Sequence, residues 1–216
     1  MAEAERTVRR KADHIRICLT KDVKHRSITA GFEDVHLIHN ALPEIRFEDI
    51  DPSTELFGHK LSHPITIAGM TGGIGEALKI NVSLAEAAEE LGLGMGVGSQ
   101  RAAIEDPKQI SSFRIVREKA PKAFLIANIG CAQLVEDYDV NDVVKAVEMI
   151  DANALAIHLN PLHEAVQIEG QRDFRGALKK IGEISQTLKI PIIAKETGSG
   201  ISAEVAKKLE EAGVDG

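Results

Sequence analysis

The chain has 216 residues, of which 44% are hydrophobic and 27% charged, and its formal net charge is −7. This length supports one sizeable domain, and the composition is that of a globular protein rather than a disordered one. The negative charge and an aromatic content of 3% argue against a nucleic-acid partner, because phosphates are repelled and few rings are present to stack on bases.

The cysteine usage and the hydropathy of the chain predict where it resides. Cys18 and Cys131 lie far apart and in no metal-ligand spacing, which fits a reducing compartment better than a disulfide framework. No apolar run approaches the roughly 18 residues that a membrane span needs. The first eleven residues are charged throughout, unlike a secretion signal. We therefore expect a cytoplasmic protein without a membrane span.

Residues 1–63 lack a regular repeat and are predicted to form an extension that packs on the following domain. Helical spacing is expected near residues 6–19, an extended segment at 35–39, and a short pair around 45–56. From Pro64 onward, short apolar segments alternate with longer amphipathic ones. The expected strands cover residues 64–69, 94–98, 123–128, 154–158 and 191–195. The expected helices cover residues 76–91, 107–119, 140–150 and 174–188, and a last helix follows the N-cap Ser202.

Strands separated by single helices predict a parallel sheet, either an open doubly wound sheet or a TIM barrel. Polar residues follow nearly every strand, namely Thr71, Ser99, Asn128, His158, Asn160 and Lys195. A barrel gathers such residues around one mouth, whereas an open sheet offers a single crevice. The predicted fold is therefore α/β, a TIM (β/α)8 barrel truncated to about five βα units over residues 64–216.

Five βα units cannot close an eight-stranded barrel, and the chain ends where a sixth strand is expected to begin. The missing strands would leave open edges. We expect either a fragment of a longer chain or a half-barrel completed by a second polypeptide. A non-catalytic half-barrel is a further alternative.

Two loops after strands carry candidate binding residues. In the turn Met70-Thr71-Gly72-Gly73, paired glycines allow close approach to a flat ring or a phosphate, although a plain βα turn would look the same. In Gly98-Ser99-Gln100-Arg101, the guanidinium could grip a phosphate, and the alternative is a solvated loop.

The densest polar cluster follows the fourth strand, in the segment His158-Leu159-Asn160-Pro161-Leu162-His163-Glu164. Alternation along the strand sends His158 and Asn160 the same way, and Glu164 could bind Mg²⁺. Lys195 ends an apolar run, where an ammonium is costly unless it meets an anion. The anion could be a reduced flavin or a carboxylate such as Glu196. Alternatively, the lysine could form a Schiff base with a sugar substrate. The basic run Arg9-Arg10-Lys11 alone indicates a solvated helix face.

In this order, the motifs resemble those of the type 2 isopentenyl-diphosphate isomerase family. The resemblance rests on 10–15, 70–73, 98–101, 127–130, 158–160 and 195–198. It implies a TIM barrel with FMN and Mg²⁺ that interconverts isopentenyl and dimethylallyl diphosphate. It also implies NADPH as reductant of the flavin, and a homo-oligomer at full length.

The resemblance assigns roles residue by residue. The implied FMN contacts are Met70, Thr71, Gly72, Ser99, Asn128 and Lys195. The implied substrate contacts are Arg10, Lys11, His14, Ser99, Gln100, Arg101, His158, Asn160 and His163. Glu164 would hold Mg²⁺, and His158 and His163 are the candidate catalytic residues.

The chain departs from the family pattern at three places. His163 stands where the family has a glutamine, and we expect this imidazole to weaken activity or make it more pH-dependent. Gln171 stands where the family has an acid, which alters the metal side. The later glycine-rich strand ends that receive the FMN phosphate are absent, so we expect this polypeptide alone to bind FMN weakly or not at all. Another FMN-dependent barrel oxidoreductase is the enzymatic alternative.

Overall fold

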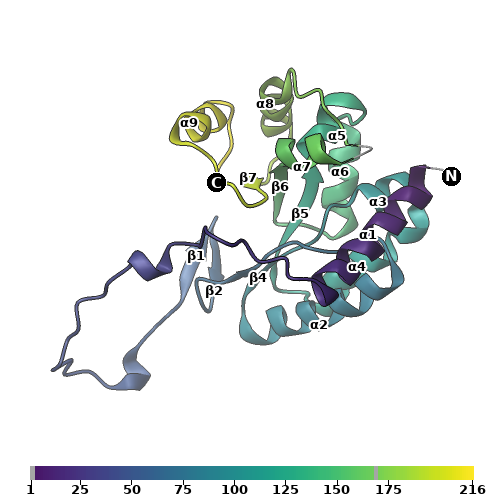
Figure 1. The fold of residues 1–216 in the computed structure, drawn as a ribbon. Coiled ribbons are helices and arrows are strands. Elements are labelled where there is room, and N and C mark those ends of the chain that lie inside the picture. The colour runs from purple at the N-terminus through teal and green to yellow at the C-terminus, as the bar shows by residue number, and fades with distance from the viewer. Residues whose placement is uncertain (1–2, 168–169) are drawn as a thin grey trace.

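The computed structural model describes residues 3–167 and 170–216, without the side chains of residues 3–8 and of Arg10. Its centre is a parallel sheet of five strands, β3 (Thr66–Ile67), β4 (Gly94–Gly96), β5 (Phe124–Gly130), β6 (Ala154–Leu159) and β7 (Ile192–Glu196), arranged in chain order (Figure 1). A doubly wound sheet reverses its strand order at a switch point, whereas a barrel adds each strand beside the previous one. The order therefore confirms the prediction of a truncated TIM barrel.

Helices connect these strands. Their bounds are α2 (Gly75–Leu91), α3 (Arg101–Glu105), η3 (Pro107–Gln109), α4 (Ser111–Lys119), α5 (Cys131–Glu136), α6 (Val140–Met149), α7 (Pro161–Val166), α8 (Ala177–Thr187) and α9 (Ala203–Glu211). Local sequence features determine where the long helices begin and end. Asp139 and Asp142 form a capping box at the start of α6, Ser202 caps α9, and α2 ends where Gly92 adopts a left-handed φ of 62°.

The sequence predicted the long helices but not α3, α5 and α7, which have five or six residues each and follow a strand at once or within a few residues. The helix expected over 107–119 is divided at Ile110 between η3 and α4. No helix in the described ranges is both long and apolar enough to cross a membrane.

The main core lies between the sheet and these helices. Phe113 of α4, Met95 of β4, Leu125 of β5 and Leu155 of β6 are all completely buried there. This core is shared by consecutive βα units, so the strand ends that carry the polar residues are held in a fixed relation to one another.

The N-terminal extension contacts the half-barrel at two places. Helix α1 (Glu3–Thr20) packs on α3. A hairpin of β1 (Thr54–Leu56) and β2 (His59–Leu61) turns at Phe57-Gly58, where both residues have positive φ (48° and 79°) as a two-residue hairpin loop requires. Leu61 packs on Phe124 and Ala154, which begin β5 and β6. The hairpin thus covers the amino-terminal ends of the strands. The pair expected around 45–56 was placed too early in the sequence.

Between these two anchors runs the strap, defined here as residues 21–52. Every strap residue except Gly31 is exposed, and its regular structure is limited to the short turns η1 (Phe32–Asp34) and η2 (Phe47–Asp49). Figure 1 shows it swinging away from the sheet and its helices. The expectation that the whole extension packs on the barrel is therefore wrong for the strap. Residues 35–39 form no strand, because no partner strand lies beside them in the described chain.

The β3 edge of the sheet differs from the sequence prediction, whereas the β7 edge lies where a sixth strand was expected. β3 has only two residues, and Ile65 and Thr66 are exposed, so the buried strand expected over 64–69 is an exposed edge strand. At the other edge, the backbone N–H groups of Asp215 and Gly216 donate to Ile192 at 2.8 and 3.3 Å, and Ala194 donates to Gly216 at 2.8 Å. These bonds set the backbone of residues 215 and 216 alongside β7.

Candidate active site at the mouth of the half-barrel

The carboxyl ends of the five parallel strands meet at one end of the sheet, here called the mouth. The register of the strands sets Gly130, His158 and Lys195 side by side across β5, β6 and β7. Thr71 and Ser99 belong to the loops that follow β3 and β4. The structure therefore brings together the strand-end residues that the sequence singled out.

His158 is held in one tautomer by its buried neighbour Asn128. The Asn128 side chain donates through Nδ2 to the carbonyl of Val97 at 2.9 Å, which fixes the orientation of the amide. Its Oδ1 then faces Nδ1 of His158 at 2.9 Å. Because this oxygen can only accept, Nδ1 carries the proton and Nε2 keeps a free lone pair.

The surroundings of His158 also keep the imidazole neutral. Burial lowers the pKa of His158 from 6.5 to about 4, and the positive charges of Lys195, His163 and Lys11 act in the same direction. The carbonyl of Ile129 opposes them weakly. At neutral pH the ring is therefore a hydrogen-bond acceptor at Nε2, not a cation.

Lys195 is a partly buried cation without a hydrogen-bond acceptor among the described residues. Burial lowers the pKa of its ammonium, and the carboxylate of Glu196 opposes this shift. Glu196 does not pair with Lys195. It accepts from the backbone N–H groups of Gly198, Ser199 and Gly200, and these bonds lower the pKa of Glu196 to about 2. The ammonium beside His158 is thus left for an anion.

The glycine turns after β3 and β4 pack against each other and against α4. The N–H of Gly98 donates to the carbonyl of Thr71 at 3.0 Å, and a Cβ on Gly98 would lie 2.5 Å from that backbone. A Cβ on Gly72 would lie 2.0 Å from the Phe113 ring. Met70, by contrast, is 79% exposed. Gly72 therefore serves packing, while Met70 and the partly exposed Thr71 are the surfaces that this turn offers to a ligand.

Helix α1 reaches the mouth through two side chains. Lys11 Nζ donates to the carbonyl of Ser99 at 3.0 Å and lies 5.8 Å from the centroid of the Phe113 ring. The rings of His14 and His163 lie 6.2 Å apart. The N-terminal helix and the short helix α7 after β6 therefore meet at the mouth.

One predicted substrate contact, Gln100, is turned away from the mouth, a second, Arg101, is paired within its own helix, and the side chain of a third is not described. Gln100 is fully buried, with Nε2 on the carbonyl of Ala146 at 2.7 Å and Oε1 on the N–H of Asn128 at 2.9 Å. Its amide supports Asn128 and offers no surface to a ligand. The Arg101 guanidinium is mostly buried and pairs with Glu105 on α3. The side chain of Arg10 lies outside the described side chains.

A network of amides and a carboxylate surrounds Glu164, and the sequence prediction missed part of it. The buried Glu164 carboxylate accepts from Asn160 Nδ2 at 2.9 Å and from the backbone N–H of Gln171 at 3.0 Å. The Gln171 side chain accepts from Gln133 of α5 at 2.7 Å. A signal for Gln133 exists at Gly130, where a Cβ would lie 2.0 Å from Gln133 Oε1. The predicted metal ligand is thus positioned by two glutamines.

Residues 4–160 of the chain match the family described as FMN-dependent dehydrogenase, which covers well over half of the sequence. The chain belongs to the FMN-dependent dehydrogenase family. Similar sequences include the isopentenyl-diphosphate delta-isomerase of Methanococcoides burtonii, 54% identical over 96% of this chain and 57% of that protein. The protein of the same name from Archaeoglobus fulgidus is 55% identical over 96% of this chain and 59% of that protein. The chain thus spans less than two thirds of the length of these relatives.

Solved structures agree on the fold. A mandelate oxidase variant with a monooxide FMN adduct covers 99% of this chain and 65% of its own, with a TM-score of 0.59 and 14% identity. A lactate oxidase of Pediococcus acidilactici covers 76% of this chain and 48% of its own, with a TM-score of 0.52 and 15% identity. At such low identity these structures support the fold alone.

Proposed function

We propose that this chain forms the part of an isopentenyl-diphosphate isomerase that binds substrate, Mg²⁺ and one face of reduced FMN. The observation that carries the proposal is that a neutral His158 lies beside Lys195, whose ammonium has no hydrogen-bond acceptor among the described residues. A diphosphate and an anionic flavin both need such a cation, and an alkene isomerisation needs a proton carrier beside it. The relatives at 50–55% identity support the choice of reaction.

The mouth suits a flavin. Lys195 would hold the negative charge of the reduced ring, and Thr71, Met70 and Ser99 provide the adjoining surfaces. When bound, reduced FMN supplies an electron-rich ring and an exchangeable proton next to the alkene. Asn128 acts one step away, because both of its side-chain atoms are occupied by Val97 and His158.

The oxygen atoms around Glu164 suit Mg²⁺. Asn160 Oδ1 is buried and has no hydrogen-bond partner in the described part of the chain, and the Nδ2 atom of the same amide lies 2.9 Å from the Glu164 carboxylate. Rotating the amide would bring two oxygens together, so the orientation is fixed. The described residues contain no cluster of three or more His, Cys, Asp or Glu able to hold a metal. A single carboxylate suits Mg²⁺, which keeps waters and takes substrate phosphate oxygens as its other ligands.

The residues of the chain then divide the work of the isomerisation. Lys11 would bind the diphosphate, and Glu164 would hold a Mg²⁺ ion that supplies further positive charge to it, so that the alkene is oriented over the mouth. The lone pair of His158 Nε2 accepts a hydrogen bond or a proton there, and Lys195 stabilises negative charge. NADPH as reductant of the flavin, a cytoplasmic location and assembly into a homo-oligomer belong to the same proposal and rest on the resemblance.

The oxidoreductase alternative has weaker support. The oxidases and dehydrogenases among the solved structures are 12–15% identical to this chain, which supports the fold only. The relatives near 54% identity bear the isomerase name. In addition, Lys11 and Glu164 offer a cation and a metal ligand for a diphosphate, which a hydroxy-acid substrate does not require.

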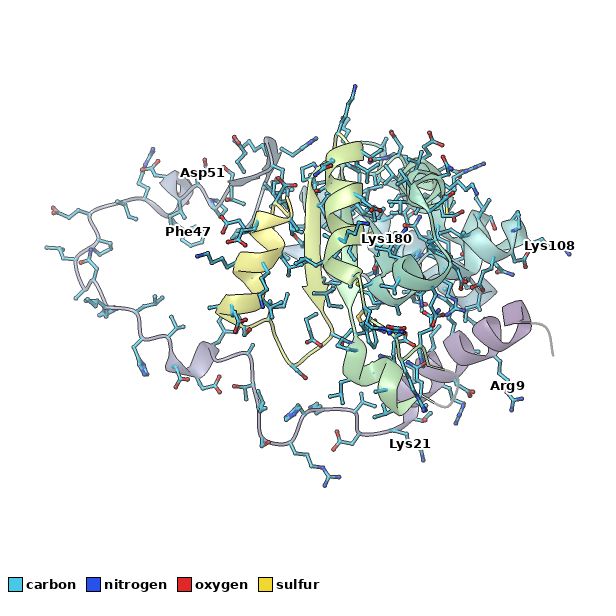
Figure 2. The ribbon with its side chains drawn as sticks, turned by 90° about the horizontal axis from the view of Figure 1, so that it is seen from above. Arg9, Lys21, Phe47, Asp51, Lys108 and Lys180 are labelled. Atoms are coloured by element: carbon cyan, nitrogen blue, oxygen red, sulfur yellow. The ribbon has the colours of Figure 1, made fainter. Side chains whose placement is uncertain are left out.

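The test is to co-express this chain with the part of the Methanococcoides burtonii protein that follows its matched region. The complex receives FMN, a reductant, Mg²⁺ and ¹³C-labelled isopentenyl diphosphate, and NMR follows the products. We expect dimethylallyl diphosphate without net oxidation. Lys11→Ala should raise the KM about tenfold or more, because a charged hydrogen bond contributes about 1.5–3 kcal/mol. Lys108→Ala is the matched control, since Lys108 lies exposed on η3 (Figure 2). A complex that binds FMN but yields only oxidised product, or none, contradicts the proposal.

A further inference from the structure

The strap exposes an unusual amount of apolar surface. Leu37 and Ile38 are 90% and 100% exposed, and Phe32 and Phe47 are 82% and 83% exposed. Soluble proteins leave single apolar side chains exposed, but several large ones exposed along one segment indicate a contact surface. Figure 2 shows the strap, on which Phe47 and Asp51 are labelled, standing apart from the helices.

The strap has a repeated design. Phe32-Glu33-Asp34-Val35 and Phe47-Glu48-Asp49-Ile50 share one pattern, and each forms a single 3-10 turn. Local bonds hold these turns, as between Arg46 and Asp49. All hydrogen bonds of strap residues in the described chain join residues no more than four apart. The turns are therefore built locally and present two aromatic–aliphatic pairs outward, with nothing of the half-barrel beneath them.

The course of the strap indicates what it encloses. The strap begins after α1, which Lys11 attaches to the mouth. It ends at the β1–β2 hairpin, which Leu61 attaches to the opposite ends of the strands. A seven-residue strand such as β5 rises about 23 Å, so roughly eight extended residues would suffice for a direct path. The strap has some four times that length, which gives it room to pass around a large body.

We infer that the strap binds the second half of the barrel. That second half is a polypeptide with the sequence of the part of the relatives that lies outside the match. The match with the Methanococcoides burtonii protein covers 57% of that relative, so about two fifths of its length lies outside. The backbone of Asp215 and Gly216 already pairs with β7, and β3 is an exposed edge. A second copy of this chain fits less well, because two five-stranded sheets give ten strands where a closed barrel has eight.

The experiment uses the whole 216-residue chain, co-expressed with a tagged polypeptide that comprises the residues of the Methanococcoides burtonii protein after its match. Amide hydrogen exchange then compares the strap in the complex and in the chain alone. We expect a one-to-one complex in which residues 32–50 exchange at least tenfold more slowly. The double variant Leu37→Asp, Ile38→Asp should weaken the complex at least tenfold, whereas Leu91→Asp on the exposed end of α2 should leave it unchanged.

Three results would overturn the inference: no association of the two polypeptides, association with an unprotected strap, or protection that arises from self-association of this chain alone. Because the strap is exposed in the free chain, the double variant should leave its circular dichroism and unfolding midpoint unchanged, which separates lost docking from lost folding. The readout is association rather than turnover. The inference therefore stands or falls independently of the isomerase proposal.

Discussion

The burial of a neutral His158 makes the stability of the protein depend on pH. The pKa of His158 is about 4 in the folded chain against 6.5 when unperturbed, so between these values the unfolded chain binds more protons. The stabilisation is complete above pH 6.5 and is lost as the pH falls toward 4. One pKa unit corresponds to about 1.36 kcal/mol, so the loss approaches about 3 kcal/mol at most, and linkage gives about 2 kcal/mol at pH 5.

The assay is urea unfolding at pH 7.5, 6.0 and 5.0 for the parent chain and for His158→Gln, whose amide can still donate but cannot titrate. We expect the free energy of unfolding of the parent to fall about 2 kcal/mol further than that of the variant between pH 7.5 and 5.0. An equal fall in both would refute the reasoning. An NMR titration provides a direct control, because an imidazole of His158 that titrates at 6.5 or above would show that burial does not govern it.

Four further substitutions, one of them with a matched control, test other parts of the site. Gly72→Ala should cost about 3 kcal/mol by forcing a methyl group against the aromatic ring beneath it, while Gly75→Ala, with open space around it, should be neutral or stabilising by up to about 1 kcal/mol; urea midpoints compare them. In the completed barrel, Lys195→Met should lower FMN affinity at least tenfold in a fluorescence titration without lowering the urea midpoint, and a fall in both would indicate a structural role. Glu164→Gln should weaken binding of Mn²⁺ plus diphosphate, followed by EPR, about tenfold to a hundredfold, and unchanged binding would remove it from the metal site. His163→Gln should raise the turnover or flatten its pH profile, and no change in either would contradict the role given to this residue.

Most of the fold could be predicted from the repeating βα pattern of the sequence. Strands of a parallel sheet are apolar runs and their connecting helices are amphipathic, so both leave periodic signals that one sequence reveals. His158 and Lys195 were placed correctly because each interrupts or ends such a run. The register then brings them together without further information.

The errors arose where contacts between distant segments decide the outcome. Gln100 follows a strand as Ser99 does, but the chain turns into α3 immediately afterwards and directs the amide into the core beside Ala146. Gln133 and Gln171 lie in a short helix and a loop without periodicity, and their place near Glu164 follows from hydrogen bonds between segments distant in the sequence. The exposure of the strap likewise depends on contacts between distant segments, because its apolar side chains alone do not show whether another segment covers them.

The chain-order arrangement of the five strands bears on how the protein is made. Each strand after β3 pairs with the strand that precedes it, at a separation of one βα unit. Contacts of short sequence separation form quickly, and domains acquire structure from the N-terminus as synthesis proceeds. A half-barrel can therefore assemble on the ribosome one βα unit at a time. At each stage the most recently formed strand is the exposed edge of the sheet, and β7 is the last of the five. Evolution can lengthen, divide or fuse such a fold between two βα units without disturbing the pairing of the preceding strands.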